Sequence, residues 1–408
     1  MADDARKPFA LHYVWKYLSI TEGWIHSQIV HLRRYRPAVI TEMRENKGVF
    51  SVPHIHALPR VTCNEGLAAK IVNGLIQALS LGRLWFLTLV LAHHPSVVHV
   101  HFGNSGWEHL FIKRILKRKY IVSFYGYDYS FLLAQNPVWK RRYQELFREG
   151  DAFIVEGPNA RRTLISLGCP EEKLFENHLG VNLSEIEFTE RKPPGPGESI
   201  RLLQIASFVE KKGHQFTVYA FAEALEEVPN LSLTFIGSGE LQGAIERLVS
   251  DLGLGNRVNF IPALPYREIL KIAQDHHIFV HPSIHASDGN CEGGAPVVLL
   301  DMQASGMPVI ATRHCDIPDY VLDRFTGFLV EEKDVPALAE RIIYLATHAE
   351  LWPLFGRRGR NHVSREFDAQ RQAERLEEIY DKVVNLASRM ACSCEQGREI
   401  SPQWNVRK

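Results

Sequence analysis

Short apolar segments alternate with longer segments of helical periodicity along almost the whole chain. A strand buried on both faces reads as a short apolar run, and a helix connecting two such strands makes them parallel. The alternation therefore predicts an α/β fold with parallel sheets covered by helices on both faces. The expected strands are Phe9–Trp15, Pro37–Met43, Val97–Phe102, Tyr120–Phe124, Asp151–Glu156, Leu174–Leu179, Arg201–Phe208, Leu231–Ile236, Arg257–Pro262, Ile278–His281, Pro308–Ala311 and Gly327–Val330. The expected helices include Thr21–Tyr35, Gly66–Leu81, Trp107–Lys119, Pro137–Gly150, Asn159–Leu167 and Arg360–Met390.

The series of strands and helices is interrupted once, where the composition shifts toward charged residues, proline and glycine. The run from Lys192 to Gly197 reads KPPGPG and is a typical linker sequence. A chain of 408 residues is long enough for two domains, each with its own core. We expect two Rossmann-like domains at residues 1–190 and 191–367, with a helix at about 368–390 that packs back on the first domain and a loose tail at 391–408. A ligand cleft is expected between the two domains.

The formal net charge is zero, but the charges are distributed unevenly. Residues 1–150 contain 20 Lys and Arg against 10 Asp and Glu, and the rest of the chain carries the opposite excess. A basic first half favours an anionic partner, such as a phosphorylated acceptor or an anionic membrane surface. The alternative is a solvated basic face. The segment Pro137–Gly150 mixes four basic residues with Trp139 and Tyr143, which suits a membrane interface, a nucleic acid or a plain exposed helix; no nucleic-acid partner is expected.

The chain begins with a polar stretch that has no secretory signal pattern, and the apolar run Leu84–Ala92 is too short to span a bilayer. Its six cysteines lack the spacing of a metal site and are expected to be reduced thiols. These features predict a cytoplasmic protein, either free or in peripheral contact with the inner face of the membrane.

The stretch Asp288–Thr312 contains a glycine-rich loop that leads into an apolar helical segment. Backbone N–H groups at the start of a helix bind phosphate, and Gly293 and Gly294 allow a close approach because they lack a Cβ atom. If the helix begins near Gly294, Asp301 lies about two turns further on and could hold the hydroxyls of a ribose. The alternative is a loop before an ordinary buried helix.

Other polar residues follow predicted strands. Lys212 comes after the strand Arg201–Phe208 and could contact a phosphate, or be a surface charge. Gly237 and Gly239 nearly form a dinucleotide fingerprint, but the third glycine is one place late, so a tight turn is the better interpretation. His101 and Asp128 follow first-domain strands and are expected to face the cleft, where they could act in acid–base chemistry or serve structure. No Asp-x-Asp triplet provides a metal clamp for a diphosphate.

Taken together, these motifs resemble the GT4-type retaining glycosyltransferases, which have the GT-B fold. The resemblance covers nearly the whole chain and is carried by Phe208–His214, Phe235–Leu241, Val280–Ser283, Glu292–Thr312 and Gly327–Val330, and more loosely by His99–Gly103, Tyr125–Asp128 and Gly180–Asn182.

The resemblance implies a role for each matching residue. Lys212 and the backbone of Gly293, Gly294, Ala295 and Pro296 would hold the donor diphosphate. Asp301 would bind the ribose, and Glu292 would reach the donor sugar. Ser207 and the turn at Gly237 and Gly239 would complete the donor site around the diphosphate and the base. His101, Asp128, Tyr125 and the loop at Glu22 would line the acceptor side.

The chain departs from the family pattern at three points. Ser207 stands where relatives often have an arginine, so one cation for the diphosphate is missing. Glu292 and Asp301 are nine positions apart instead of the usual eight, and the second acid is aspartate instead of glutamate.

The function predicted from the resemblance is a metal-independent, retaining hexosyltransferase that moves a sugar from a nucleotide diphosphate sugar, with UDP-sugar favoured, to a saccharide or lipid-linked acceptor in polysaccharide or glycolipid biosynthesis. No cofactor is expected beyond the donor, which is a co-substrate. Two alternatives remain open: a nucleotide-sugar epimerase of the same fold, and a non-catalytic, membrane-docked nucleotide-sugar binding protein. An NAD-dependent oxidoreductase ranks last because its fingerprint is broken.

Overall fold

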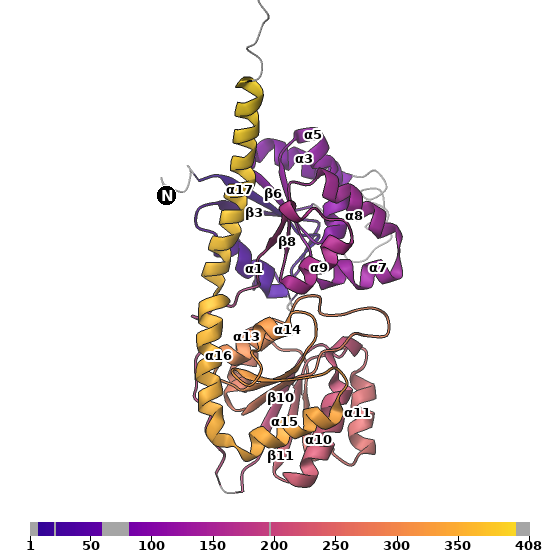
Figure 1. Cartoon of the computed structure of the whole chain (residues 1–408), viewed down its shortest axis with the longest axis vertical. Coiled ribbons are helices and arrows are strands. Elements are labelled where there is room, and N and C mark those ends of the chain that lie inside the picture. The colour runs from indigo at the N-terminus through magenta and orange to yellow at the C-terminus, as the bar shows by residue number, and fades with distance from the viewer. Residues whose placement is uncertain (1–6, 20–21, 59–80, 196, 397–408) are drawn as a thin grey trace, which may run out of the picture.

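The computed structural model describes residues 7–19, 22–58, 81–195 and 197–396, which form two α/β domains stacked along the long axis of the molecule (Figure 1). The first domain contains a seven-stranded sheet in the order β5-β3-β1-β6-β7-β8-β9, and all of its strand pairs are parallel. The prediction of parallel α/β sheets is therefore confirmed for this domain. The strands are β1 (Phe9–Tyr13), β3 (Arg36–Thr41), β5 (Ile55–Ala57), β6 (Val97–His101), β7 (Lys119–Ser123), β8 (Ala152–Val155) and β9 (Leu174–Glu176).

The second domain contains a six-stranded parallel sheet in the order β12-β11-β10-β13-β14-β15. This order runs outward from β10 in both directions, as in a Rossmann fold, so the topological switch point lies between β10 and β13. In the first domain, the corresponding point lies between β1 and β6. The strands are β10 (Ile200–Ile205), β11 (Leu231–Ile236), β12 (Val258–Ile261), β13 (Ile278–His281), β14 (Val309–Thr312) and β15 (Gly327–Val330).

Helices cover both faces of each sheet because the strands are apolar on both sides. In the second domain, α10, α11 and α15 bury their apolar residues on one face, and α12 and α13 bury theirs on the other. Helix α16 contributes to both clusters, with Trp352 and Phe355 in the first and Val363 in the second. These helices are α10 (His214–Glu227), α11 (Gln242–Asp251), α12 (Tyr266–Gln274), α13 (Val298–Ala304), α14 (Ile317–Tyr320), α15 (Val335–Thr347) and α16 (Trp352–Glu366). Those of the first domain are α1 (Gly23–Val30), α3 (Leu81–His93), α4 (Gly103–Glu108), α5 (Phe111–Leu116), α6 (Gly126–Tyr129), α7 (Phe131–Gln135), α8 (Val138–Glu149) and α9 (Pro158–Ser166).

The helix predicted at residues 107–119 is instead two short helices, α4 and α5. Helix α4 begins directly after β6, where Gly106 packs on β7 so closely that a Cβ atom would lie 2.6 Å from Val122. A sequence that reads as a glycine-rich loop therefore forms a helix, because the small residues allow tight contact with the sheet. The sequence also missed β5, α3, α6 and α7. The helix predicted at residues 66–81 falls almost entirely in 59–80, outside the described residues.

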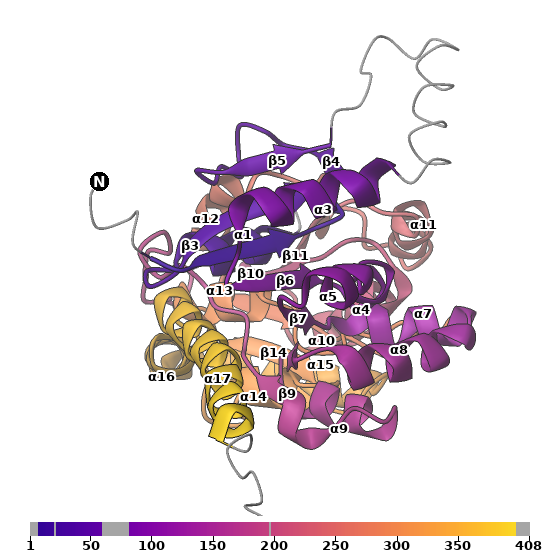
Figure 2. The ribbon, with the colours of Figure 1, turned by 90° about the horizontal axis from the view of Figure 1, so that it is seen from above.

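The final helix, α17 (Ala369–Gln396), leaves the second domain and runs along the first (Figures 1 and 2). Ala373, Leu376 and Tyr380 pack into a core cluster with first-domain strand residues. The carboxylate of Glu377 accepts backbone N–H groups of Arg33, Arg34 and Tyr35 at 2.5 to 3.0 Å. The helix continues to Gln396, past residue 391, where the sequence predicted a loose tail.

The chain enters the second domain before the predicted boundary at residue 191. Val181 and Ile186 belong to a core cluster of the second domain. Arg191 is buried, and its guanidinium donates to the backbone oxygens of His276, Ala273 and Ser305. No helix within the described ranges is both long enough and apolar enough to cross a membrane.

Candidate donor site between the domains

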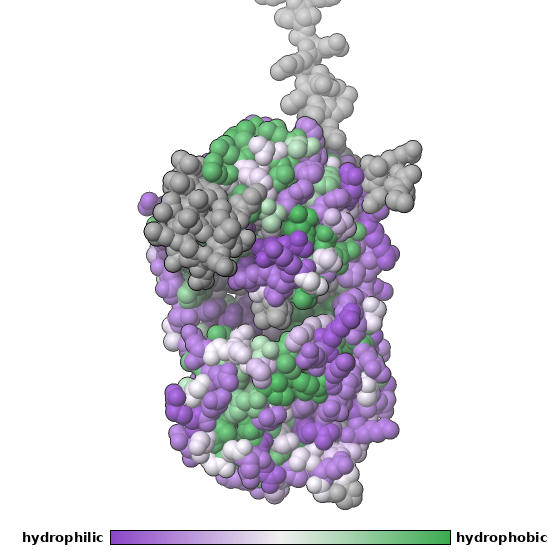
Figure 3. All heavy atoms as spheres, turned by 180° about the vertical axis from the view of Figure 1, so that it is seen from behind, coloured by the Kyte–Doolittle hydropathy of each residue, from purple (hydrophilic) through white to green (hydrophobic). Residues whose placement is uncertain are grey.

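The carboxyl ends of the two sheets face each other, and the loops that follow the strands meet between the domains. The segment 284–297, which follows β13, runs along the first domain (Figure 1). A Cβ atom on Gly126 would lie 2.1 Å from the backbone oxygen of Glu292, and one on Gly293, whose φ is +79°, would lie 2.1 Å from the Gly126 Cα. Both positions therefore require glycine. Seen from behind, the surface is hollowed between the two lobes (Figure 3).

Lys212 and Glu292 form an ion pair at the switch point of the second domain. The Nζ of Lys212 lies 2.8 Å from Oε2 of Glu292, and the Nζ of Lys211 lies 3.8 Å from the same oxygen. Ser283 Oγ donates to the other carboxylate oxygen at 2.7 Å. The Glu292 side chain is only 6% exposed; burial raises the pKa of its carboxyl, but Lys212 and Lys211 outweigh this effect and hold the pKa well below its usual range. The site thus holds a buried carboxylate and two ammonium groups.

The local fold places Lys212 there through a tight turn. Lys212 ends the 3₁₀ turn η4 (Glu210–Lys212), which follows β10, and the next residue, Gly213, has a φ of +67°. A Cβ atom on Gly213 would lie 1.9 Å from the backbone oxygen of Pro282, so the loops after β10 and β13 are in direct contact. Gln204 Nε2 donates to the Lys212 backbone oxygen at 2.8 Å. Burial lowers the pKa of the Lys212 ammonium, and Glu292 opposes that shift.

The turn at residues 293–296 lies directly against the first domain. Helix α13 begins at Val298, four residues later than predicted, so residues 293–296 form an extended turn before it. A Cβ atom on Gly294 would lie 2.0 Å from Oε2 of Glu156, and the Glu156 carboxyl also bonds the backbone of Ala295. Burial, then Asp316 and Glu292, raises the pKa of Glu156 to about 8. The turn is buried at the interface with the first domain, where the Glu156 carboxyl accepts the backbone N–H of Ala295. Binding of a diphosphate by this turn stays a prediction.

Asp301 lies in the first turn of α13, not two turns along it, because the helix begins late. Its carboxyl is 7% exposed and accepts the hydroxyl of Tyr266, from α12, at 2.8 Å. Burial raises the pKa of this carboxyl to about 7.

Ser207, Gly237 and Gly239 come together where the loops after β10 and β11 meet. A Cβ atom on Gly237, whose φ is +155°, would lie 2.0 Å from the backbone oxygen of Ala206. A Cβ atom on Gly239 would lie 2.6 Å from that of Phe208. The two glycines thus allow one loop to pass over the other, which supports the interpretation as a tight turn.

His101 and Asp128 do not face the cleft, contrary to expectation, because both side chains are fully buried. His101 lies between His12, at 3.1 Å, and the hydroxyl of Tyr125, at 2.8 Å. Asp128 accepts the backbone N–H of Tyr125 at 2.8 Å as part of the capping box of α6, and burial raises its pKa to about 7. In this structure, His101 belongs to a buried hydrogen-bond network and Asp128 caps a helix. Their roles at the acceptor side stay predictions.

The sequence analysis missed several residues of the site. Glu156 follows β8, Asn159 donates from its side chain to the Gly293 backbone oxygen at 2.8 Å, and His314 accepts the backbone N–H of Glu292 at 3.0 Å. Glu156 and His314 both lie just after a strand, which is the signal that pointed to Lys212. Nothing in the sequence indicates that they approach the turn at 293–296, because that depends on how the two domains dock.

Two sequence profiles match successive parts of the chain: Glycosyltransferase Family 4 matches residues 33–185, and Glycosyl transferases group 1 matches residues 185–362. A GDP-mannose-dependent monoacylated alpha-(1-6)-phosphatidylinositol monomannoside mannosyltransferase from Corynebacterium glutamicum is 30% identical over 285 residues, which are 69% of this chain and 69% of that protein. The chain belongs to the GT4-type glycosyltransferases. The amylovoran biosynthesis glycosyltransferase AmsK of Erwinia amylovora is 28% identical over 290 residues, which are 70% of each chain.

Solved structures confirm the GT-B fold of this GT4-type chain. The sucrose-phosphate synthase of Thermosynechococcus elongatus superimposes with a TM-score of 0.73 at 19% identity, over 93% of this chain and 100% of that chain. The Anabaena protein HepE, in complex with UDP-glucose, superimposes with a TM-score of 0.68 at 15% identity, over 93% and 99% of the two chains.

Proposed function

We propose that this GT4-type chain transfers a sugar from a nucleotide diphosphate sugar to a saccharide or lipid-linked acceptor, in the biosynthesis of a polysaccharide or glycolipid. The observation that carries the proposal is the Lys212–Glu292 pair at the switch point between β10 and β13. Ligands of open α/β sheets bind at such a point, outside the carboxyl ends of the strands. The Glu292 backbone lies directly against Gly126 of the first domain, so a donor bound at the pair would lie close to an acceptor held by that domain.

The site supplies the charges that this transfer requires. Lys212 and Lys211 would compensate the negative charge that develops on the leaving diphosphate, and the backbone of residues 293–296 would donate to its oxygens. The donor must displace Glu156 from the Ala295 backbone, and protonation of Glu156 makes that displacement easier. Tyr266 and Asp301 would face the ribose, and Glu292 would face the sugar.

We infer transfer with retention of the anomeric configuration. The bond between the anomeric carbon and the diphosphate oxygen breaks, the acceptor oxygen attacks from the same face, and a diphosphate oxygen takes the acceptor proton. This route requires no protein nucleophile. The absence of an Asp-x-Asp clamp from the sequence favours transfer without added Mg²⁺ or Mn²⁺.

UDP-sugar is the donor that we favour, and GDP-sugar is the direct competitor. HepE binds UDP-glucose, whereas the Corynebacterium relative is described as GDP-mannose-dependent. Neither Ser207 nor the turn at Gly237 carries a base-specific side chain that decides between the two. A thermal-shift series with UDP-, GDP- and ADP-sugars tests this choice, and stabilisation by a GDP-sugar alone would contradict the UDP assignment.

The first domain suits an acceptor presented at an anionic membrane. Hydrophobic residues gather at its end (Figure 3), where Figure 1 also shows α3 and α5. Exposed apolar residues of these helices are Leu81, Leu84 and Leu91 of α3 and Ile115 of α5. Helix α5 and the residues that follow it also carry Lys113, Arg114, Lys117, Arg118 and Lys119. Lys113 and Lys119 pair with Asp151, and Arg114 pairs with Glu145 and Glu149, so the charge left for a membrane comes from Lys117 and Arg118. Exposed apolar residues beside basic ones are typical of peripheral membrane contact. Co-sedimentation with vesicles that contain anionic lipid, against neutral vesicles, tests this surface.

Assays of nucleotide release and of sugar transfer to an acceptor distinguish the proposal from its alternatives. With a nucleotide sugar and a panel of saccharide and lipid-linked acceptors, we expect acceptor-dependent release of nucleotide diphosphate and a glycosylated product. Release of nucleotide without any acceptor would instead favour an epimerase. Tight donor binding with no turnover across the panel would favour a non-catalytic binding protein.

A further inference from the structure

Two thiols and an imidazole meet beside Glu292. The ligand atoms of Cys291, Cys315 and His285 all lie within 4.8 Å of one another. Cys291 is buried, Cys315 is half-buried, and the His285 side chain is 64% exposed, so the cluster reaches from the interior to solvent. The cysteines are spaced irregularly along the sequence, and the fold alone brings these two together.

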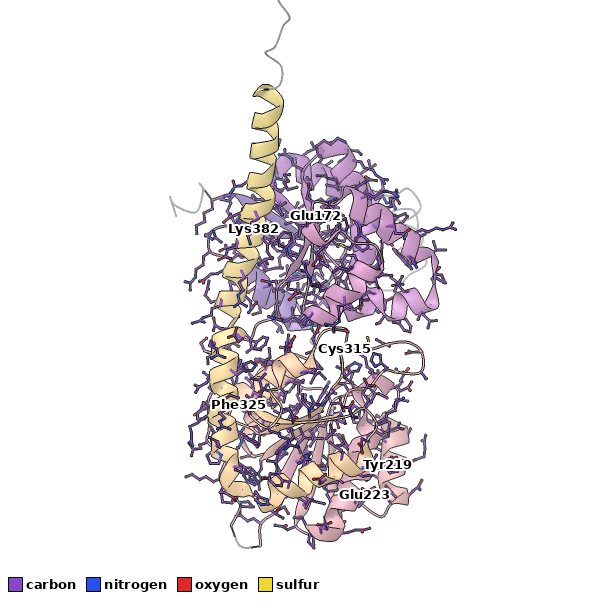
Figure 4. All side chains as sticks on the ribbon, in the orientation of Figure 1. Glu172, Tyr219, Glu223, Cys315, Phe325 and Lys382 are labelled. Carbon is purple, nitrogen blue, oxygen red and sulfur yellow. The ribbon has the colours of Figure 1, made fainter. Side chains whose placement is uncertain are left out.

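The topology of the second sheet explains the cluster. Strands β13 and β14 are parallel neighbours, so their carboxyl ends lie at the same edge of the sheet. His285 and Cys291 lie in the segment that follows β13, and Cys315 lies three residues after β14. Figure 4 shows Cys315 at the end of the second domain that faces the first.

One carboxylate orients the imidazole of His285 and that of its neighbour His314. Oε1 of Glu332 lies 2.8 Å from Nδ1 of His285 and 2.7 Å from Nδ1 of His314. A carboxylate bonded to Nδ1 fixes the proton there and leaves a lone pair on Nε2, which is the arrangement around most metal-bound histidines. The Nε2 of His314 accepts the Glu292 N–H at 3.0 Å and lies 3.2 Å from the Sγ of Cys315. Among the described residues, the Nε2 of His285 has no hydrogen-bond partner, so it is the nitrogen left for a metal.

We propose that Cys291, Cys315 and His285 form a zinc site, with two thiolates and one imidazole as protein ligands and a water molecule in the fourth position. Thiolate and imidazole are the ligands that zinc prefers, with Zn–S distances of about 2.3 Å and Zn–N distances of about 2.0 Å. Tetrahedral ligands at these distances stand roughly 3 to 4 Å apart, so the present cluster requires only a small contraction. The exposure of His285 gives the water a path to the fourth position.

The metal would hold the donor loop in place. Cys291 directly precedes Glu292, and Cys315 directly precedes Asp316, whose backbone N–H donates to Gly294 at 3.1 Å. Asp316 also accepts the backbone N–H of Asn159 from the first domain at 2.7 Å. Through Cys291 the metal ion would fix the start of the turn 292–294. Through Cys315 and Asp316 it would fix the end of the turn, at the interface with the first domain. This consequence rests on the proposed function, but zinc binding itself does not.

Zinc content of the purified full-length chain tests the proposal without any donor or acceptor. Every variant is made in a chain that already carries Cys392→Ser and Cys394→Ser, so that this closely spaced cysteine pair near the C-terminus cannot bind zinc. In a reducing buffer we expect about one zinc ion per chain after gel filtration, measured by elemental analysis. Cys291→Ser and Cys315→Ser are each expected to lower zinc affinity at least tenfold. The matched control Cys169→Ala, at a buried cysteine in the first-domain core, is expected to retain the ion.

Alkylation of the unsubstituted thiols provides a measurement that does not depend on the variants folding. Bound zinc is expected to slow iodoacetamide labelling of Cys291 and Cys315, but not of Cys169, as followed by mass spectrometry. A Co²⁺-loaded chain is expected to show the absorption bands of thiolate ligation. No zinc binding at micromolar concentration, equal binding by the Cys291→Ser and Cys315→Ser variants, or a Cys291–Cys315 disulfide in place of bound metal would each overturn the proposal.

Discussion

Substitution of Lys212 separates a role in the reaction from a role in the fold. In Lys212→Met, the buried Glu292 carboxylate loses the cation at 2.8 Å but keeps Lys211 at 3.8 Å and the Ser283 hydroxyl at 2.7 Å. The Coulomb energy of an ion pair falls as the inverse of the distance between the charges. If both pairs are screened equally, the Lys211–Glu292 energy is therefore about three-quarters of the Lys212–Glu292 energy. The loss of unfolding free energy should therefore be about 1–2 kcal/mol, below the roughly 3–5 kcal/mol for an uncompensated buried charge.

The effect on transfer should be larger than the effect on stability. Lys212 would compensate charge on the leaving diphosphate, and removal of one such group typically lowers kcat by about 10²–10³-fold. Steady-state kcat and KM for the donor, measured beside a denaturant titration, give both quantities. Lys271→Met is the control, because this lysine is exposed in the last turn of α12. A Lys212→Met enzyme with kcat within a few fold of wild type would refute the reasoning.

Three further substitutions test how the domains are held together. Gly126→Ala places a Cβ atom 2.1 Å from the Glu292 backbone oxygen, so the domains must separate; we expect a larger radius of gyration in small-angle scattering and a higher donor KM. Glu156→Gln removes a buried acid with a pKa raised to about 8, so its thermal stability relative to wild type should increase as the pH rises from 5 to 9. Tyr380→Phe leaves Nδ1 of His99 without its hydroxyl partner at 2.7 Å, and denaturant titration should show a loss of about 1–3 kcal/mol.

The sign of the Glu156 prediction follows from proton linkage. The folded-state pKa of about 8 exceeds the ordinary value of 4.5, so the folded chain binds more protons than the unfolded chain between these pH values. The contribution of Glu156 to stability therefore declines as the pH rises through this window and is constant above it. Glutamine does not titrate. The pH dependence of the difference in stability between variant and wild type therefore reports on Glu156 and not on the other buried acids. A difference that is the same at every pH would contradict the assignment.

Matched controls accompany the other two substitutions. Gly255→Ala adds a Cβ atom that meets nothing within 4 Å, so it should leave the scattering and KM unchanged. Tyr344→Phe removes a hydroxyl from a partly exposed tyrosine and should change stability by well under 1 kcal/mol. Unchanged scattering in Gly126→Ala, or equal effects of the two tyrosine substitutions, would show that the contacts do not hold the domains as described.

The sequence predicted those parts of the site that depend on local pattern. Lys212 was predicted from its place after a strand. Glu292 was assigned to the same donor site only by the family resemblance, and the ion pair between the two was not predicted. Gly293 was predicted to allow close backbone approach, but the partner in this structure is the backbone of Gly126. That contact depends on the docking of two domains, which leaves no periodic signal in the sequence.

Burial explains the predictions that failed. His101 is the last residue of β6 and Asp128 lies in α6, just after β7, so both were predicted to face the cleft. Instead, His12, Tyr125 and the capping box of α6 enclose them. Likewise, the helix after the glycine-rich turn begins at Val298, because the turn follows the surface of the first domain before the helix can form. In both cases, packing between distant segments overrides the local pattern.

The central claim is that a nucleotide diphosphate binds between the domains at Lys212 and the turn at residues 293–296. A crystal structure of the chain with UDP, and one with GDP, tests this claim most directly. The account predicts diphosphate oxygens within hydrogen-bond distance of the Lys212 Nζ and of the backbone N–H groups of the turn, with the Glu156 carboxyl moved away from Ala295 and the ribose beside Asp301. A nucleotide bound elsewhere, with Glu156 still on the turn and Lys212 still paired only with Glu292, would contradict it.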